Sequence, residues 1–77
     1  MIDETRLQII MDQVKTEFIE ASQNFGSFHN YHEGYAVLKE EVDELWDEIK
    51  GQQRTFELRT EARQVAAMAI RFLYDCT

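Results

Sequence analysis

Residues 31–50 read YHEGYAVLKEEVDELWDEIK, and this stretch decides the fold. Its apolar side chains recur at steps of three and four residues, which is the spacing of one buried face on an α-helix. Charged side chains fill the positions between them. The members of this apolar face are Tyr35, Leu38, Val42, Leu45 and Ile49. The pattern predicts a helix from about Tyr31 to Lys50.

The preceding segment, residues 3–25, shows the same periodicity. Asp3 has the side chain of an N-cap, and Glu4 suits the positive end of a helix dipole. Gly26 is a natural left-handed stop, so a first helix of about 22 residues should end at Phe25. Its apolar positions are Leu7, Ile10, Met11, Val14, Phe18, Ala21 and Phe25.

A third helix follows a short break at residues 51–53, GQQ. Gly51 is suited to end the second helix, and a connection this short forces the next helix back antiparallel to it. The third helix should run to about Tyr74. Its apolar stripe contains Leu58, Ala62, Val65, Ala66, Ala69, Phe72 and Leu73.

Length and composition favour one all-α domain over residues 1–77. The chain has 77 residues, no proline and three glycines, which suits long helices better than strands and turns. A solitary core is marginal at this length. We therefore expect an antiparallel hairpin plus an N-terminal helix, assembled as a homodimer or homotetramer whose four-helix-bundle core combines helices from two subunits.

The charge balance argues for metal and against duplex nucleic acid. Fifteen acidic residues outweigh eight basic ones, for a net charge of -7, whereas phosphate-backbone binding depends on lysine and arginine. The single cysteine fits a reducing compartment. The chain has no apolar run of membrane-spanning length and no signal-peptide pattern. We expect a cytoplasmic protein that binds no membrane.

Carboxylates are arranged so that the hairpin should gather them. Glu41 and Glu44 lie one turn apart on the second helix, as do Glu61 and Gln64 on the third. Glu41 lies ten residues before Gly51 and Glu61 ten after it, so each should stand roughly 15 Å from the turn. The two pairs of side chains would then meet at one level. Such a set of hard oxygen ligands, including the Gln64 amide oxygen, suits Mg²⁺ or Mn²⁺.

The segments HEGYAVLKEEVDELWDEIK and EARQVAAMA resemble the EExxE plus ExxD signature of the MazG-like all-α nucleoside triphosphate pyrophosphohydrolases. The likeness covers about residues 29–75. It implies that Glu41, Glu44 and Glu61 bind metal and that Glu40 matches the additional glutamate of the first motif. It also implies Mg²⁺-dependent hydrolysis of a nucleoside triphosphate to monophosphate and pyrophosphate, with Glu40 or an acid beside the metal activating water.

Two departures from the family pattern matter for this expectation. Gln64 stands where the family has aspartate, so metal should bind more weakly unless Asp75 or Glu48 compensates. Many family members also continue into a further helix that encloses the nucleotide, a part that another subunit would have to supply. The alternatives are an inactive relative that binds a nucleotide or a protein as a helical oligomer, and a purely structural helical module.

The arginines of the third helix each allow two interpretations. Arg71 could hold a phosphate through its planar guanidinium, or pair with Asp75 four residues on. Arg54, Arg59 and Arg63 are either solvated or intersubunit partners of the acidic second helix.

The aromatic and histidine side chains are equally ambiguous. Trp46 and Phe56 could stack on a base or seal a helix interface. His29 and His32 make a poor zinc site without a cysteine partner, so packing in the loop or at an interface is the better interpretation.

Overall fold

The chain forms three long helices. The computed structural model describes residues 1–51 and 55–77, and in these ranges it contains α1 (Glu4–Phe25), α2 (Tyr31–Lys50) and α3 (Thr55–Cys76) and no strand. The predicted all-α class is confirmed, and so are the bounds of the first two helices. The third helix continues two residues beyond Tyr74.

Capping residues explain where α1 and α2 begin and end. The Asp3 carboxylate accepts a hydrogen bond from the backbone N–H of Arg6 at 3.0 Å, and Gly26 ends α1 with φ 71°, as expected of a left-handed stop. At the start of α2, Asn30 accepts from the backbone N–H of Glu33 at 2.9 Å. Gly51 ends α2 with φ -84°, so this stop needs no left-handed backbone.

Part of the predicted connection after α2 lies outside the described residues. The break was expected to continue through Gln52 and Gln53, and the predicted arginine cluster begins at Arg54. The other two members of that cluster, Arg59 and Arg63, lie in the first half of α3.

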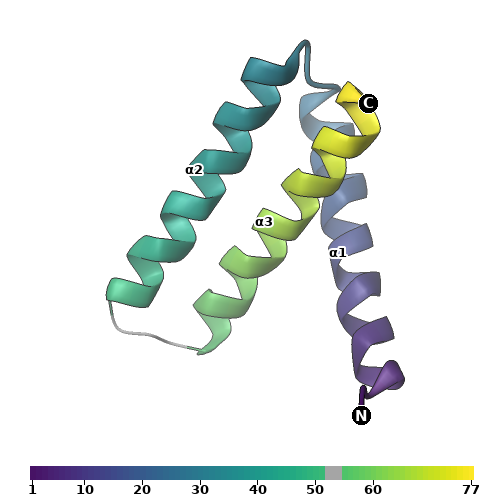
Figure 1. The fold of residues 1–77 in the computed structure, drawn as a ribbon, viewed down its shortest axis with the longest axis vertical. Helices are drawn as coiled ribbons and strands as arrows, with labels where there is room; N and C mark the ends of the chain where they lie inside the picture. The colour runs from purple at the N-terminus through teal and green to yellow at the C-terminus, as the bar shows by residue number, and fades with distance from the viewer. Residues whose placement is uncertain (52–54) are drawn as a thin grey trace.

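The three helices are arranged around α3 (Figure 1). α2 and α3 form the predicted antiparallel hairpin, and α1 packs against α3 on its other side. Within the described residues, α1 and α2 do not pack directly against each other. α3 is therefore the only described helix that contacts both others.

The buried core is small for three helices of this length. Among the described residues, its apolar members with little exposure are Val14, Phe28, Ala67 and Met68. Phe18 of α1 extends this core through an edge-to-face contact with Tyr74 of α3, with ring centroids 5.3 Å apart. Many other apolar side chains stay exposed. None of the described helices has the length and apolar content needed to cross a membrane.

The last turns of α3 hold the segment that connects α1 to α2. Arg71 is only 3% exposed, and its Nη2 donates to the backbone carbonyl oxygen of Gly26 at 2.6 Å. Its guanidinium also lies 4.2 Å from the ring centroid of Phe28. One turn further, the Asp75 carboxylate accepts from the backbone N–H of Phe28 at 3.0 Å. Arg71 thus places a cation at the negative end of α1, whose own last turn has no basic residue.

Gly34 lies where α2 packs tightly against a side chain of α3. A Cβ atom at this position would lie 2.7 Å from Cδ2 of Phe72 and 3.2 Å from Cδ2 of Phe28. We predict that Gly34→Ala lowers the free energy of unfolding by about 1–3 kcal/mol because the rings must move. At an open helical site the same change would stabilise by up to about 1 kcal/mol. Chemical denaturation measures the difference, and a variant as stable as the wild type would contradict this packing.

Candidate metal centre

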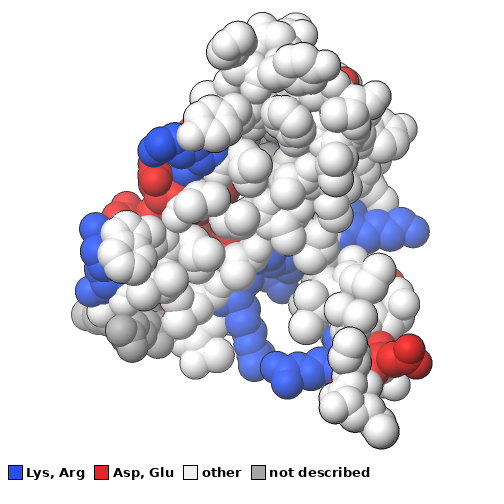
Figure 2. Space-filling view, in the orientation of Figure 1, with Lys and Arg blue, Asp and Glu red and all other residues white. Residues whose placement is uncertain are grey.

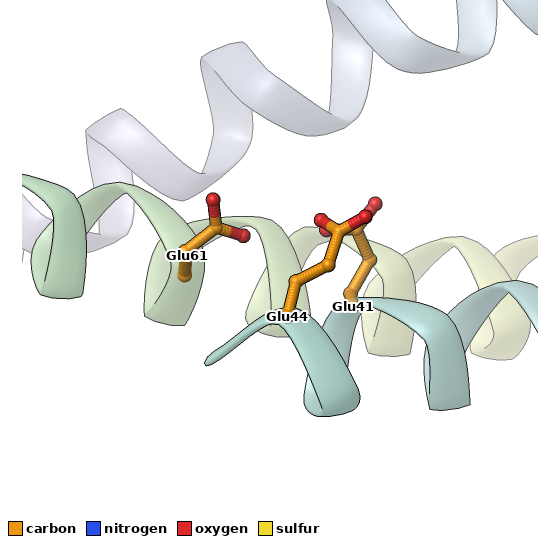
Figure 3. Close-up of side chains that lie close together, drawn as sticks. All are labelled: Glu41, Glu44 and Glu61. Carbon is orange, nitrogen blue, oxygen red and sulfur yellow. The ribbon is translucent and has the colours of Figure 1, made fainter. Parts of the chain in front are cut away.

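Three glutamates from the hairpin come together at one point. Glu41 and Glu44 of α2 and Glu61 of α3 each offer a carboxylate oxygen, and these oxygens all lie within 4.8 Å of one another. Figure 3 shows the three side chains extending from the two helices toward the same side of the hairpin. The structure therefore brings together all three acids that the sequence predicted as metal ligands.

The local structure explains why these side chains meet. Glu41 and Glu44 are one helical turn apart, which places both on one side of α2. Because α3 runs antiparallel to α2, Glu61 lies at the matching level across the hairpin. Glu41 and Glu61 are half-buried against the neighbouring helix, whereas Glu44 is exposed.

The electrostatics of the cluster disfavour three bare negative charges. Burial, followed by the negative charge of Glu44, raises the pKa of Glu41 to about 7. Burial and the charge of Glu44 also raise the pKa of Glu61. A cation placed among the carboxylates would relieve both the lost hydration and the mutual repulsion.

Two carboxylate oxygens of the cluster are buried without a hydrogen-bond partner in the described chain. The Oε2 atoms of Glu41 and Glu61 are buried and make no hydrogen bond with the described part of the chain. A buried carboxylate oxygen without a partner is costly, and a bound cation satisfies it. Oxygens on opposite sides of one Mg²⁺ lie about 4.2 Å apart, close to the observed spread of up to 4.8 Å. The donors present therefore fit a hard divalent cation.

Glu40, Glu48 and Gln64 are three more site residues predicted on the hairpin. Glu40 is exposed on α2, and its charge contributes to the raised pKa of Glu41. The charge of Glu48 contributes likewise to the raised pKa of Glu61. Gln64 is half-buried on α3, one turn beyond Glu61.

Arg71 and Asp75 are engaged elsewhere. Arg71 was expected to hold a phosphate or to pair with Asp75, but its buried guanidinium contacts Gly26 and Phe28. Asp75, one of the two acids expected to compensate for Gln64, accepts from the backbone of Phe28 instead. The structure thus brings neither residue to the glutamate cluster. The sequence could not reveal these roles, because their partners are more than 40 positions away in the chain.

The two histidines lie in and just after the connection between α1 and α2. His29 is exposed and its Nδ1 lies 2.8 Å from the carboxylate of Glu33, which raises the pKa of the imidazole through this hydrogen bond. Glu33 also accepts from the backbone N–H of His29, at 3.3 Å. His29 therefore supports the start of α2 together with Glu33.

A cleft between α1 and α3 is a separate feature of the structure. It has a volume of about 570 Å³ and lies between the first halves of α1 and α3. Its walls combine apolar side chains such as Ile9 and Phe56 with the arginines Arg6, Arg59 and Arg63. None of the clustered glutamates lines it, so this cleft is separate from the glutamate cluster.

Compared with known protein families, curated proteins and solved structures, the chain gives no match.

The raised pKa values predict how stability depends on pH in the absence of metal. Between about 4.5 and about 7 the folded chain binds more protons than the unfolded chain, so the free energy of unfolding should fall as the pH rises through this window. Thermal unfolding in EDTA should give a lower Tm at pH 8 than at pH 5.5. Glu41→Gln should flatten this dependence.

A matched control separates the cluster from general acidity. Glu20→Gln removes the same charge from an exposed position on α1 and should leave the slope of Tm against pH unchanged. If Glu41→Gln kept the wild-type slope, the burial of the Glu41 carboxylate beside Glu44 and Glu61 would be disproved.

Proposed function

We propose that this chain is a Mg²⁺-dependent nucleotide pyrophosphohydrolase of the MazG-like kind, converting a nucleoside triphosphate to its monophosphate and pyrophosphate. The observation that carries the proposal is the meeting of Glu41, Glu44 and Glu61, with two buried carboxylate oxygens that have no hydrogen-bond partner in the described chain. The EExxE motif on α2 and the first glutamate of ExxD on α3 supply these same residues.

The chain's own residues have distinct parts in this proposal. Glu41, Glu44 and Glu61 hold the divalent cation, which is Mg²⁺ or Mn²⁺, and Gln64 adds an uncharged amide oxygen. The bound cation supplies charge neutralisation for the triphosphate and for the leaving pyrophosphate. Without it, the acidic surface would repel the substrate.

Hydrolysis also needs a water molecule and an acceptor for its proton. The water oxygen forms a bond to phosphorus as the bond to the departing pyrophosphate breaks. Glu40 is exposed beside Glu41, and a carboxylate at this position can orient the water and accept its proton. The reaction requires no covalent intermediate with the protein.

The proposal includes self-association in the cytoplasm. Few apolar side chains are fully buried, which supports a homodimer or homotetramer in which helices of two copies complete a four-helix-bundle core. Self-association of this kind does not depend on catalysis. A helical oligomer that binds a nucleotide or a protein without hydrolysis is the second candidate function, and the observation that favours it is the neutral Gln64.

Gln64→Asp tests whether this position faces the metal. The change restores the carboxylate of the ExxD motif, and a unit charge about 4 Å away is worth on the order of 1–4 kcal/mol near a protein surface. We predict Mg²⁺ binding about tenfold tighter by isothermal titration. Gln23→Asp, which adds the same charge at an exposed site on α1, should leave the affinity unchanged. Equal affinities in both variants would place Gln64 outside the site.

The catalytic proposal is tested by pyrophosphate release from a panel of nucleoside triphosphates with Mg²⁺ or Mn²⁺. Glu41→Gln and Glu44→Gln keep the shape of each side chain and remove its charge, so turnover should fall at least about 100-fold while helicity is retained. Glu20→Gln is the matched control and should retain full turnover. Unchanged turnover in either cluster variant would refute the assignment.

A binding protein without activity would give a different pattern. The wild-type chain would then release no pyrophosphate from any nucleotide, yet Mg²⁺ or a nucleotide would still raise its Tm. A purely structural module would show neither effect.

A further inference from the structure

The cleft between α1 and α3 gathers positive charge in an otherwise acidic chain. Figure 2 shows Lys and Arg side chains, in blue, along the hollow between these two helices in the lower part of the view. Arg6 lines the cleft from α1, and Arg59 and Arg63 line it from α3. No aspartate or glutamate is among the described residues that form its walls. The lining is therefore positive, although the chain has a net charge of -7.

Two of the three arginines have no carboxylate partner. The Nε atom of Arg63 lies 3.7 Å from a carboxylate oxygen of Glu17, which neutralises part of its charge. The guanidinium groups of Arg6 and Arg59 are exposed and form no ion pair within residues 1–51 and 55–77. A cleft lined by charges of one sign attracts ligands of the opposite sign. Since a planar guanidinium can donate two parallel hydrogen bonds, the fitting ligand group is a carboxylate or a phosphate.

The remaining walls of the cleft are mostly apolar. Ile9 is 54% exposed and Phe56 is 74% exposed, so both offer apolar surface to a ligand. Val14 is buried and Ala66 half-buried, and they line the cleft together with these two side chains. The volume of about 570 Å³ is in the range of sites for small molecules. A ligand of this size would bury apolar surface as well as pair with arginine.

The uncharged polar groups of the cleft do not suit a nucleobase. Gln13 and Thr60 are the uncharged polar side chains among its described lining residues. The Gln13 Oε1 atom accepts a hydrogen bond from Arg63 at 3.5 Å, and the Thr60 hydroxyl donates to the backbone carbonyl oxygen of Phe56 at 3.0 Å. Few groups are thus left to pair with the polar edge of a base or with a sugar. An apolar ligand body fits these walls better.

We infer that this cleft binds a small anionic amphiphile, a molecule with one carboxylate or phosphate group and an aliphatic or aromatic body. The anionic group pairs with Arg6 and Arg59, and the body packs against Ile9 and Phe56. Such a site uses none of the clustered glutamates. Its ligand is also distinct from the nucleotide proposed as substrate.

Fluorescence of anilinonaphthalene sulfonate tests the site, because this aromatic anion emits strongly in apolar surroundings. We expect saturable binding of one molecule per chain. Octanoate and octyl phosphate should both displace the probe, and the stronger competitor identifies the preferred anionic group. Octanol has the same aliphatic body without a charge and should displace the probe at least about tenfold less effectively.

Variants of the two unpaired arginines locate the binding site. Arg6→Gln and Arg59→Gln each remove one charge at an exposed position, and each should weaken binding of octanoate about tenfold while helicity is retained. Lys15→Gln removes the same charge from an exposed position of α1 outside the cleft and should bind like the wild type. Isothermal titration of octanoate into each variant measures the affinities.

Wild-type affinity in both arginine variants, or equal displacement by octanol and octanoate, would overturn the inference. Absence of saturable binding to the wild type would also overturn it, including the case in which sedimentation shows a dimer whose second copy covers the cleft. Glu41→Gln should bind octanoate like the wild type. Loss of hydrolysis in that variant, or its absence in the wild type, therefore does not bear on this site.

Discussion

The rest of the structure depends on the hydrogen bonds between the end of α3 and the segment that connects α1 to α2. Arg71 reaches the carbonyl oxygen at the end of α1, and Asp75 holds the backbone that leads into α2. Since α1 and α2 do not pack against each other within the described residues, their relative placement depends on these contacts and on the faces that each presents to α3. The antiparallel hairpin then brings its glutamates to one level.

The glutamate cluster raises the free energy of the folded chain unless something offsets the repulsion. A solvated acidic face would account for the exposed Glu44. It does not account for Glu41 and Glu61, whose half-buried carboxylates each keep one oxygen without a hydrogen-bond partner in the described chain. Proteins accept such a cost where a site needs it. A divalent cation is the simplest species that offsets the repulsion and lost hydration of these carboxylates. The need for such a cation connects the packing of the hairpin to the proposed chemistry.

Much of this fold could be predicted from the sequence, because helical periodicity and capping residues are local signals. Asp3, Gly26 and Lys50 lie where the pattern places the helix ends, and equal spacing from Gly51 brings Glu41 opposite Glu61. The burial of Arg71 could not be predicted, because it depends on Gly26 and Phe28, which only the folded chain brings near. The predicted buried face of α2 was only partly right: Leu38 and Leu45 are half-buried, whereas Tyr35, Val42 and Ile49 are exposed. Periodicity gives the apolar side of a helix but not how much of it a neighbouring helix covers.

The central claim is that Glu41, Glu44 and Glu61 together hold one divalent cation or more. A crystal structure of the chain soaked in Mn²⁺, with anomalous diffraction data collected at the manganese absorption edge, tests this most directly. The account predicts an anomalous peak within bonding distance, about 2.2 Å, of carboxylate oxygens from all three glutamates. A saturating Mn²⁺ concentration that left the cluster without a peak, or placed the only peaks elsewhere, would contradict it.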